Sequence, residues 1–272
     1  MDWPNSGPIV RTFGWNDAGT PYLSIDIKDS GVIRAAETGE ILFERNASTD
    51  DNKGRLPLPS RGWLALLHEA AIISIYQGLL LDNSSKGLIN KGEILGVASL
   101  EDSRGNMLIP FSLYDDEEAS WINPEAVMAL PEAPEGTEVN PNEGLPVIIK
   151  SLLENEDKAK IDIDNSRQLA QGRYNLLVHG RITGIEDSAP YRILVLVNGI
   201  EAGSLSTESF SAKDGSLLVQ RNGLFETARI YENAPYINVA SFFLTRGLAN
   251  IEIIAQNRAG KETRQQYALR IE

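Results

Sequence analysis

The chain has 272 residues, of which 42% are hydrophobic and none is cysteine, and its formal net charge is −13 at pH 7. This composition belongs to a folded protein with room for two modest domains, and it excludes disulfides, thiolate metal sites and a cysteine nucleophile. The acidic balance argues against a nucleic-acid partner, because binding a phosphate backbone needs clustered Lys and Arg. The 23 glycines and 13 prolines favour a turn-rich, mainly β protein.

Short runs of β-forming residues, bounded by Gly, Asp or Asn, predict strands throughout the first half of the chain. They are Ser24–Ile27, Gly31–Arg34, Glu40–Phe43, Trp63–Leu67, Ile72–Tyr76 and Glu93–Ala98. The polar segment Asn46–Pro59 is expected to be a loop, and Pro124–Leu130 to form at least one helical turn.

A segment rich in Pro, Glu, Gly and Asn follows that helical turn and predicts an extended linker. We therefore expect a first domain over residues 1–130, a linker over 131–146 and a second domain over 147–272.

The second half also has the patterns of strands. Tyr174–Ile182 alternates, Arg192–Val197 is almost continuously apolar, and Asn198-Gly199 is a two-residue hairpin signal. Further strands are expected at Ser216–Gln220, Tyr236–Thr245, Ala249–Gln256 and Gln265–Ile271. About seven strands over this length favour an immunoglobulin-like β-sandwich.

Several short landmarks follow one another in order along the first half. They are Trp3-Pro4, Phe13-Gly14, Ser24–Ile27, the run from Gly31 to Ile41, Ile73–Tyr76, Ile89–Gly96, Gly105–Leu113 and Trp121–Pro124. Together they resemble the lysostaphin-type peptidoglycan endopeptidases, a family of zinc peptidases. The resemblance covers residues 3 to about 130 and implies an antiparallel β domain with glycines at its turns.

The resemblance also implies where zinc ligands would stand. The family binds zinc through a His and an Asp four residues apart and through the second His of an H-x-H motif. Asp26 matches the Asp, but Tyr22 replaces the first His, and Leu108 and Pro110 occupy the H-x-H positions. Gly78 replaces a further histidine. One carboxylate does not make a catalytic zinc site, so we expect no metal, no cofactor and no zinc-hydrolase activity.

The candidate site is therefore a degenerate groove with no catalytic residue. It comprises Tyr22, Ser24, Asp26, His68, Tyr76, Gly78, Leu108 and Pro110. Asp26 is either a structural hydrogen-bond acceptor or a polar anchor in the groove. Tyr22 either fills the volume of the lost metal site or stacks on a sugar or peptide. His68 is expected at a strand end, with a proton shuttle beside Glu69 as the alternative, and His179 inside the sandwich.

The resemblance implies a non-catalytic protein of the cell envelope that binds peptidoglycan or a protein partner, such as a cell-wall hydrolase, through this groove. An active metallo- or other hydrolase with an atypical site, and a structural or adhesive module, are the alternatives. A periplasmic or cell-surface location would require that a signal peptide preceded Met1-Asp2-Trp3-Pro4 and was removed. The sequence contains no apolar run of 18 residues, so no transmembrane helix is predicted. The oligomeric state is left open.

Overall fold

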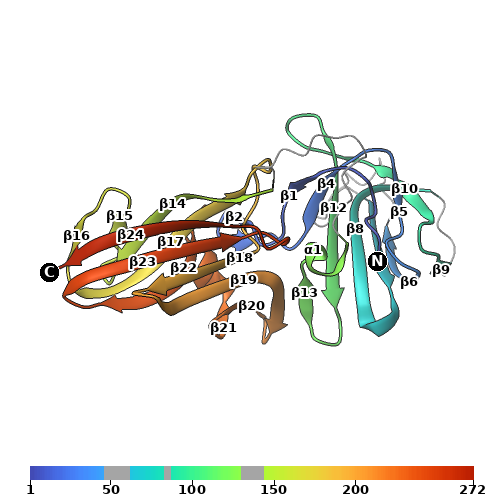
Figure 1. Cartoon of the computed structure of the whole chain (residues 1–272). Coiled ribbons are helices and arrows are strands. Elements are labelled where there is room, and N and C mark those ends of the chain that lie inside the picture. Colours follow the sequence, from blue (N-terminus) through green and yellow to red (C-terminus); the bar gives the residue numbers. More distant parts are fainter. Residues whose placement is uncertain (46–61, 83–86, 130–143) are drawn as a thin grey trace, which may run out of the picture. The chain divides into compact units, whose positions relative to one another are not determined.

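The computed structural model describes residues 1–45, 62–82, 87–129 and 144–272 (Figure 1). The fold is mainly β, as predicted. Contacts divide the chain into two units: Met1–Thr12 with Leu23–Thr137, and Phe13–Tyr22 with Glu138–Glu272. The predicted loop Asn46–Pro59 and most of the predicted linker lie outside the described residues. Within the described ranges, no helix is long and apolar enough to cross a membrane.

The first unit is an antiparallel β domain centred on three neighbouring strands, β4, β12 and β8. Its strands are β1 (Ile9–Arg11), β4 (Ile25–Lys28), β5 (Val32–Arg34), β6 (Gly39–Arg45), β7 (Gly62–Leu67), β8 (Ile72–Leu81), β9 (Leu88–Ile89), β10 (Ile94–Ala98), β11 (Leu100–Glu101), β12 (Met107–Asp115) and β13 (Ser120–Ile122). β12 pairs with β4 on one side and with β8 on the other. Its residues 108–113 are buried on both faces of the sheet.

Two elements of the first unit differ from the predicted ones. The predicted strand ends at Tyr76, but β8 continues to Leu81. Gly78, at φ +71°, forms a bulge, and the strand resumes its pairing after it. The predicted helical turn is present as α1, which covers Pro124–Val127, a narrower range than the predicted one. Asn123 caps it by accepting a hydrogen bond from the Glu125 amide, and Pro124 occupies its first turn.

The second unit contains two packed β-sheets. One has the order β15 (Lys160–Asp162), β14 (Pro146–Asn155), β17 (Gly172–Ile182), β22 (Ile237–Leu244). The other has the order β16 (Gln168–Leu169), β24 (Glu262–Ile271), β23 (Gly247–Gln256), β18 (Arg192–Val197), β19 (Ile200–Lys213), β20 (Ser216–Arg221), β21 (Leu224–Glu226). Strand β14 contacts β23 and β24, so the sheets face each other as a sandwich. An immunoglobulin-like topology stays a prediction.

The hairpin predicted at Asn198-Gly199 is present. Both residues have positive φ, 51° and 79°, and they join β18 directly to β19. Strands β14 and β19 are not among the predicted ones. In β19 only five of the fourteen residues are apolar and their spacing is irregular, so the strand carries a weak hydrophobic pattern.

The segment Phe13–Tyr22 belongs to the second unit, although the predicted boundaries assign it to the first domain. It carries the short strands β2 (Asn16–Asp17) and β3 (Thr20–Pro21). The Phe13 ring lies 5.2 Å from that of Phe210. The Asn16 amide donates to the carbonyl of Tyr231, the last residue of helix α2 (Thr227–Tyr231), at 2.9 Å. This segment therefore supplies core contacts to a sandwich that follows more than a hundred residues later.

Candidate functional site

The register of β4 and β12 assembles one face of the central sheet. Asp26 is the direct partner of Pro110, and Lys28 is the partner of Leu108. Side chains of directly paired residues point to the same side of a sheet. We call this side the Asp26 face and define it by Ser24, Asp26, Lys28, Leu108, Pro110 and Ser112. The Ser24 and Ser112 hydroxyls form a hydrogen bond of 2.6 Å across it.

A cation from the neighbouring strand meets the carboxylate of Asp26. Arg11 of β1 pairs with Asp26 of β4, and its Nη1 lies 3.3 Å from Asp26 Oδ2. The Asp26 side chain is only 3% exposed and that of Arg11 is 29% exposed. Because a buried carboxylate is stable only with compensating charge and hydrogen bonds, the guanidinium supplies positive charge that offsets the desolvation of Asp26.

The space beside Gly78 is filled by a neighbouring side chain. A Cβ atom built on Gly78 would lie 2.6 Å from Cβ of Leu100, closer than real side chains approach. Leu100 is the register partner of Leu108, so it shares the Asp26 face. Gly78 therefore adjoins this face, and its lack of a side chain is what leaves room for Leu100.

The donor chemistry of this face does not fit zinc. Of the residues at the family's ligand positions, Asp26 is the one carboxylate, and Leu108 and Pro110 offer no side-chain ligand. Within the described part of the chain, no three His, Cys, Asp or Glu side chains gather as they would around a metal ion. Ser24, Asp26, Leu108, Gly78 and Pro110 are all buried.

Tyr76 and His68 lie on the opposite face of the same sheet. Tyr76 pairs with Phe111, and their ring centroids are 5.2 Å apart. Burial raises the pKa of Tyr76 to about 12, although the Ala36 amide donates a hydrogen bond to its hydroxyl. His68 stands at a strand end with both ring nitrogens hydrogen-bonded, Nδ1 to the Thr38 carbonyl and Nε2 to the Ser74 hydroxyl. These contacts give both residues a structural role away from Asp26.

Tyr22 falls in the segment that packs with the second unit. Its backbone forms a small hairpin, in which its amide donates to the Trp15 carbonyl and its carbonyl accepts from the Gly14 amide, both at 2.8 Å. His179, on β17, lies with its ring centroid 5.8 Å from that of Tyr236. The structure thus brings together Ser24, Asp26, Gly78, Leu108 and Pro110, and it separates His68 and Tyr76 from them.

Two residues of the Asp26 environment were missed by sequence reasoning. Arg11 is the only cation in the short apolar run before Phe13-Gly14, which is a weak signal for an ion pair. Leu100 has no signal at all, because its place beside Gly78 depends on the pairing of β11 with β12.

Comparisons with known proteins find only distant similarity. No curated protein matches the chain. A protein-family model without a descriptive name matches residues 145–272. Among solved structures, an NMR structure of lysostaphin is 11% identical with a TM-score of 0.37, covering 98% of this chain and 95% of that one.

A second structure, of the antimicrobial peptidase lysostaphin from Staphylococcus simulans, is 12% identical with a TM-score of 0.36 and covers 97% of each chain. Helicobacter pylori Csd3 is 16% identical with a TM-score of 0.35, over 48% of this chain and only 35% of Csd3. These TM-scores are too low to define a shared fold, so the residues of this chain have to carry the functional conclusion.

Proposed function

We propose that this chain is a non-catalytic, peptidase-like protein of the cell envelope that binds peptidoglycan. Its first unit derives from a lysostaphin-type peptidase and has replaced the zinc centre with an ion pair. The observation that carries this proposal is the pairing of Asp26 with Pro110. The ordered landmarks match these two residues separately to the family's Asp and second His, and two ligands of one metal have to stand side by side.

Loss of catalysis follows from the chemistry of the same face. A zinc peptidase uses its metal to polarise the scissile carbonyl and to lower the pKa of the attacking water. Here Arg11 supplies the positive charge beside Asp26, and Leu100 fills the space next to Gly78. An arginine neutralises a carboxylate but provides neither a Lewis acid nor an activated water. Cleavage of peptidoglycan is therefore not expected, with or without added zinc.

Because the residues around Asp26 are buried, exposed residues beside them would contact the ligand. Lys28 is exposed at the end of β4 and shares the Asp26 face. Its ammonium group can pair with the carboxylates of peptidoglycan stem peptides, an interaction that salt weakens. The buried residues of the former site would support this surface without touching the ligand.

Sedimentation with purified peptidoglycan tests both parts of the proposal. The protein is expected to co-sediment at low salt and less at moderate salt, and to release no soluble fragments when zinc is added. Lys28→Glu should reduce the bound fraction severalfold. Lys213→Glu, the same charge change at an exposed hairpin of the second unit, should leave it unchanged. Absence of retention at both salt concentrations would reject peptidoglycan as the ligand and direct the search to an envelope protein, and zinc-dependent release of fragments would contradict the loss of catalysis.

A further inference from the structure

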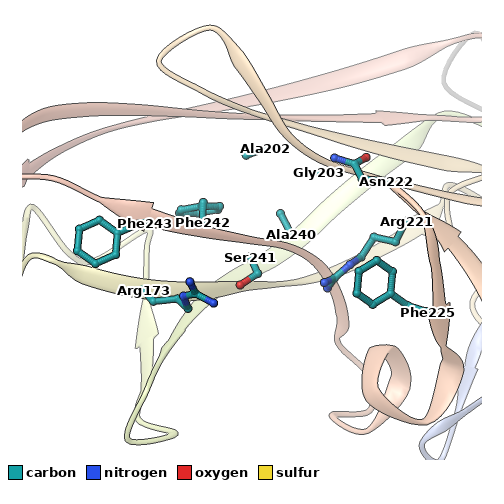
Figure 2. Close-up of a pocket in the computed structure, with 10 residues that line it drawn as sticks. All are labelled: Arg173, Ala202, Gly203, Arg221, Asn222, Phe225, Ala240, Ser241, Phe242 and Phe243. Atoms are coloured by element: carbon teal, nitrogen blue, oxygen red, sulfur yellow. The ribbon is translucent and has the colours of Figure 1, made fainter.

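A pocket of about 500 Å³ opens in the second unit, separate from the Asp26 face. Strands β22 and β17 line one side, and β19 with the β20–β21 turn lines the other (Figure 2). Small residues make this space. Gly203 lies so close to β22 that a Cβ atom there would stand 2.6 Å from the Val239 carbonyl oxygen. Ala202 and Ala240 also leave the centre open.

Two arginines give this pocket a positive charge in a strongly acidic protein. Arg173 of β17 and Arg221 of β20 both line it, and its ten lining residues include no Asp or Glu. Neither arginine has an acidic partner within the part of the chain that the structure describes. In Figure 2 their guanidinium groups approach the Ser241 hydroxyl from two sides.

Arg221 is held in place by neutral groups alone. Its Nη1 donates to the carbonyl oxygen of Asn238 at 3.2 Å and to the side-chain oxygen of Asn238 at 2.8 Å. Its guanidinium stacks over the Phe225 ring, 4.5 Å from the centroid. Burial lowers the pKa of Arg221, as expected for a cation that has lost water without gaining an anion. A fixed, partly desolvated guanidinium of this kind attracts an anionic ligand.

The pocket also offers apolar surface to the rest of a ligand. Phe225 is 37% exposed and Phe243 is 53% exposed, and both line the same space. Phe243 is the register partner of Arg173, so an aromatic ring and a guanidinium stand side by side on one face. Among the described strands, β22 is the last of its sheet, and it faces β19 beside the pocket.

We propose that this pocket binds the free carboxylate end of a peptide, with the carboxylate between Arg173, Ser241 and Arg221 and an apolar side chain against Phe225 and Phe243. Planar guanidinium groups match the two oxygens of a carboxylate. The neighbouring rings favour a ligand whose acid group is attached to an apolar residue over a fully hydrated inorganic anion. The pocket does not depend on the function proposed for the first unit.

Titration of the full chain with synthetic peptides, followed by NMR amide shifts, tests this site. The probe is N-acetyl-Ala-Ala-Leu with a free carboxylate, compared with its C-terminal amide. The free acid should shift the amides of Arg173, Ser241 and Phe243 saturably. Loss of a charge-assisted hydrogen bond should weaken binding of the amide about 10-fold or more.

Variants separate this pocket from general charge effects. Arg173→Ala should weaken the free-acid peptide about 10-fold, as expected for one ionic contact, whereas Arg181→Ala, an equal charge change on the same strand, should not. Phe243→Ala should also weaken binding, and because this side chain is exposed the fold should persist. The proposal would be overturned if the acid and the amide bound equally or if no saturable shift appeared. It would also be overturned if the Arg181 variant lost as much affinity as the Arg173 variant, or if equimolar inorganic phosphate displaced the peptide.

Discussion

At the scale of single residues, the Asp26 face differs from a metal site in how its charge is balanced. Arg11 can still reach water, whereas the carboxylate of Asp26 cannot. Removing either partner therefore has unequal consequences. A buried carboxylate without its cation loses compensation for its desolvation, whereas a partly exposed guanidinium without its anion keeps some of its hydration.

This asymmetry gives a prediction for stability. Arg11→Met should lower the free energy of unfolding by about 3 kcal/mol, as for other buried ion pairs that lose one partner. Asp26→Leu should cost less, and the double variant should be more stable than the sum of the single losses implies. Chemical denaturation of the four proteins measures this cycle. If the two single variants lost equal free energy of unfolding and the double variant lost their sum, the two side chains would not be coupled.

Gly78 gives a second prediction, with Gly92 as a matched control. Both glycines have positive φ, 71° and 77°, but a Cβ at Gly92 would meet nothing within 4 Å. Gly92→Ala should thus cost about 1 kcal/mol of backbone strain, and Gly78→Ala should cost about 2 kcal/mol more from overlap with Leu100. Thermal unfolding measures both. Adding Leu100→Ala should recover part of the loss at Gly78 only. Equal losses in the two glycine variants would place Leu100 elsewhere.

His179 makes stability depend on pH. Burial lowers its pKa from the usual 6.5, and the nearby charge of Arg181 lowers it further. Below about pH 6.5 the unfolded chain therefore binds a proton that the folded chain refuses, so this contribution to stability is lost as the pH falls. Replacement by Gln should make the melting temperature fall less between pH 7 and pH 5 than in the parent protein. A parallel fall in both proteins would contradict the assignment.

At the scale of elements, the pattern of the sequence predicted strands more reliably than it predicted the site. Local runs of β-forming or apolar residues were enough to predict β7, β17 and β18. The Asn198-Gly199 turn was also predicted, but β19, which follows it, was not. Asp26 and Pro110, which the resemblance assigns separately to ligand positions, are register partners. Neither alternation nor resemblance indicated Arg11 or Leu100, because both reach the site through pairings between distant segments.

Pro110 shows how one substitution fits its strand. A proline inside a sheet removes a backbone donor and is tolerated where the ladder is incomplete. The pairing of β12 with β8 begins only at Phe111, next to the bulge at Gly78, so Pro110 lies outside that ladder. Gly78 and Pro110 therefore adjoin the same irregularity of the sheet.

At the scale of the whole molecule, the two structural units do not follow the boundary predicted at the linker. Residues 13–22 pack into the core of the second unit. No local sequence pattern predicts this, because their partners, Phe210 and Tyr231, lie about two hundred residues away. Tyr231 is fully buried and its hydroxyl donates to the Gly14 carbonyl at 3.0 Å. A boundary drawn at the linker therefore cuts through the second unit.

A substitution at Asn16 tests this arrangement. Its side chain donates to two buried or half-buried carbonyls, those of Tyr231 and Tyr236. Asn16→Ala should destabilise the second unit by about 2 kcal/mol, because both acceptors lose their partner. Hydrogen exchange should show faster opening of β22 and α2, with β4 and β12 unchanged. Faster exchange confined to the first unit would contradict the assignment of residues 13–22.

Zinc content is the most direct measure of the proposed replacement of a peptidase zinc centre by an arginine ion pair. The purified full chain, dialysed against zinc and then against buffer, should retain far less than one zinc per molecule. Asp26→Asn should not change that value, and neither should Tyr22→His, since the other ligand positions stay without donors. One tightly held zinc per chain, lost on Asp26→Asn, would contradict the account.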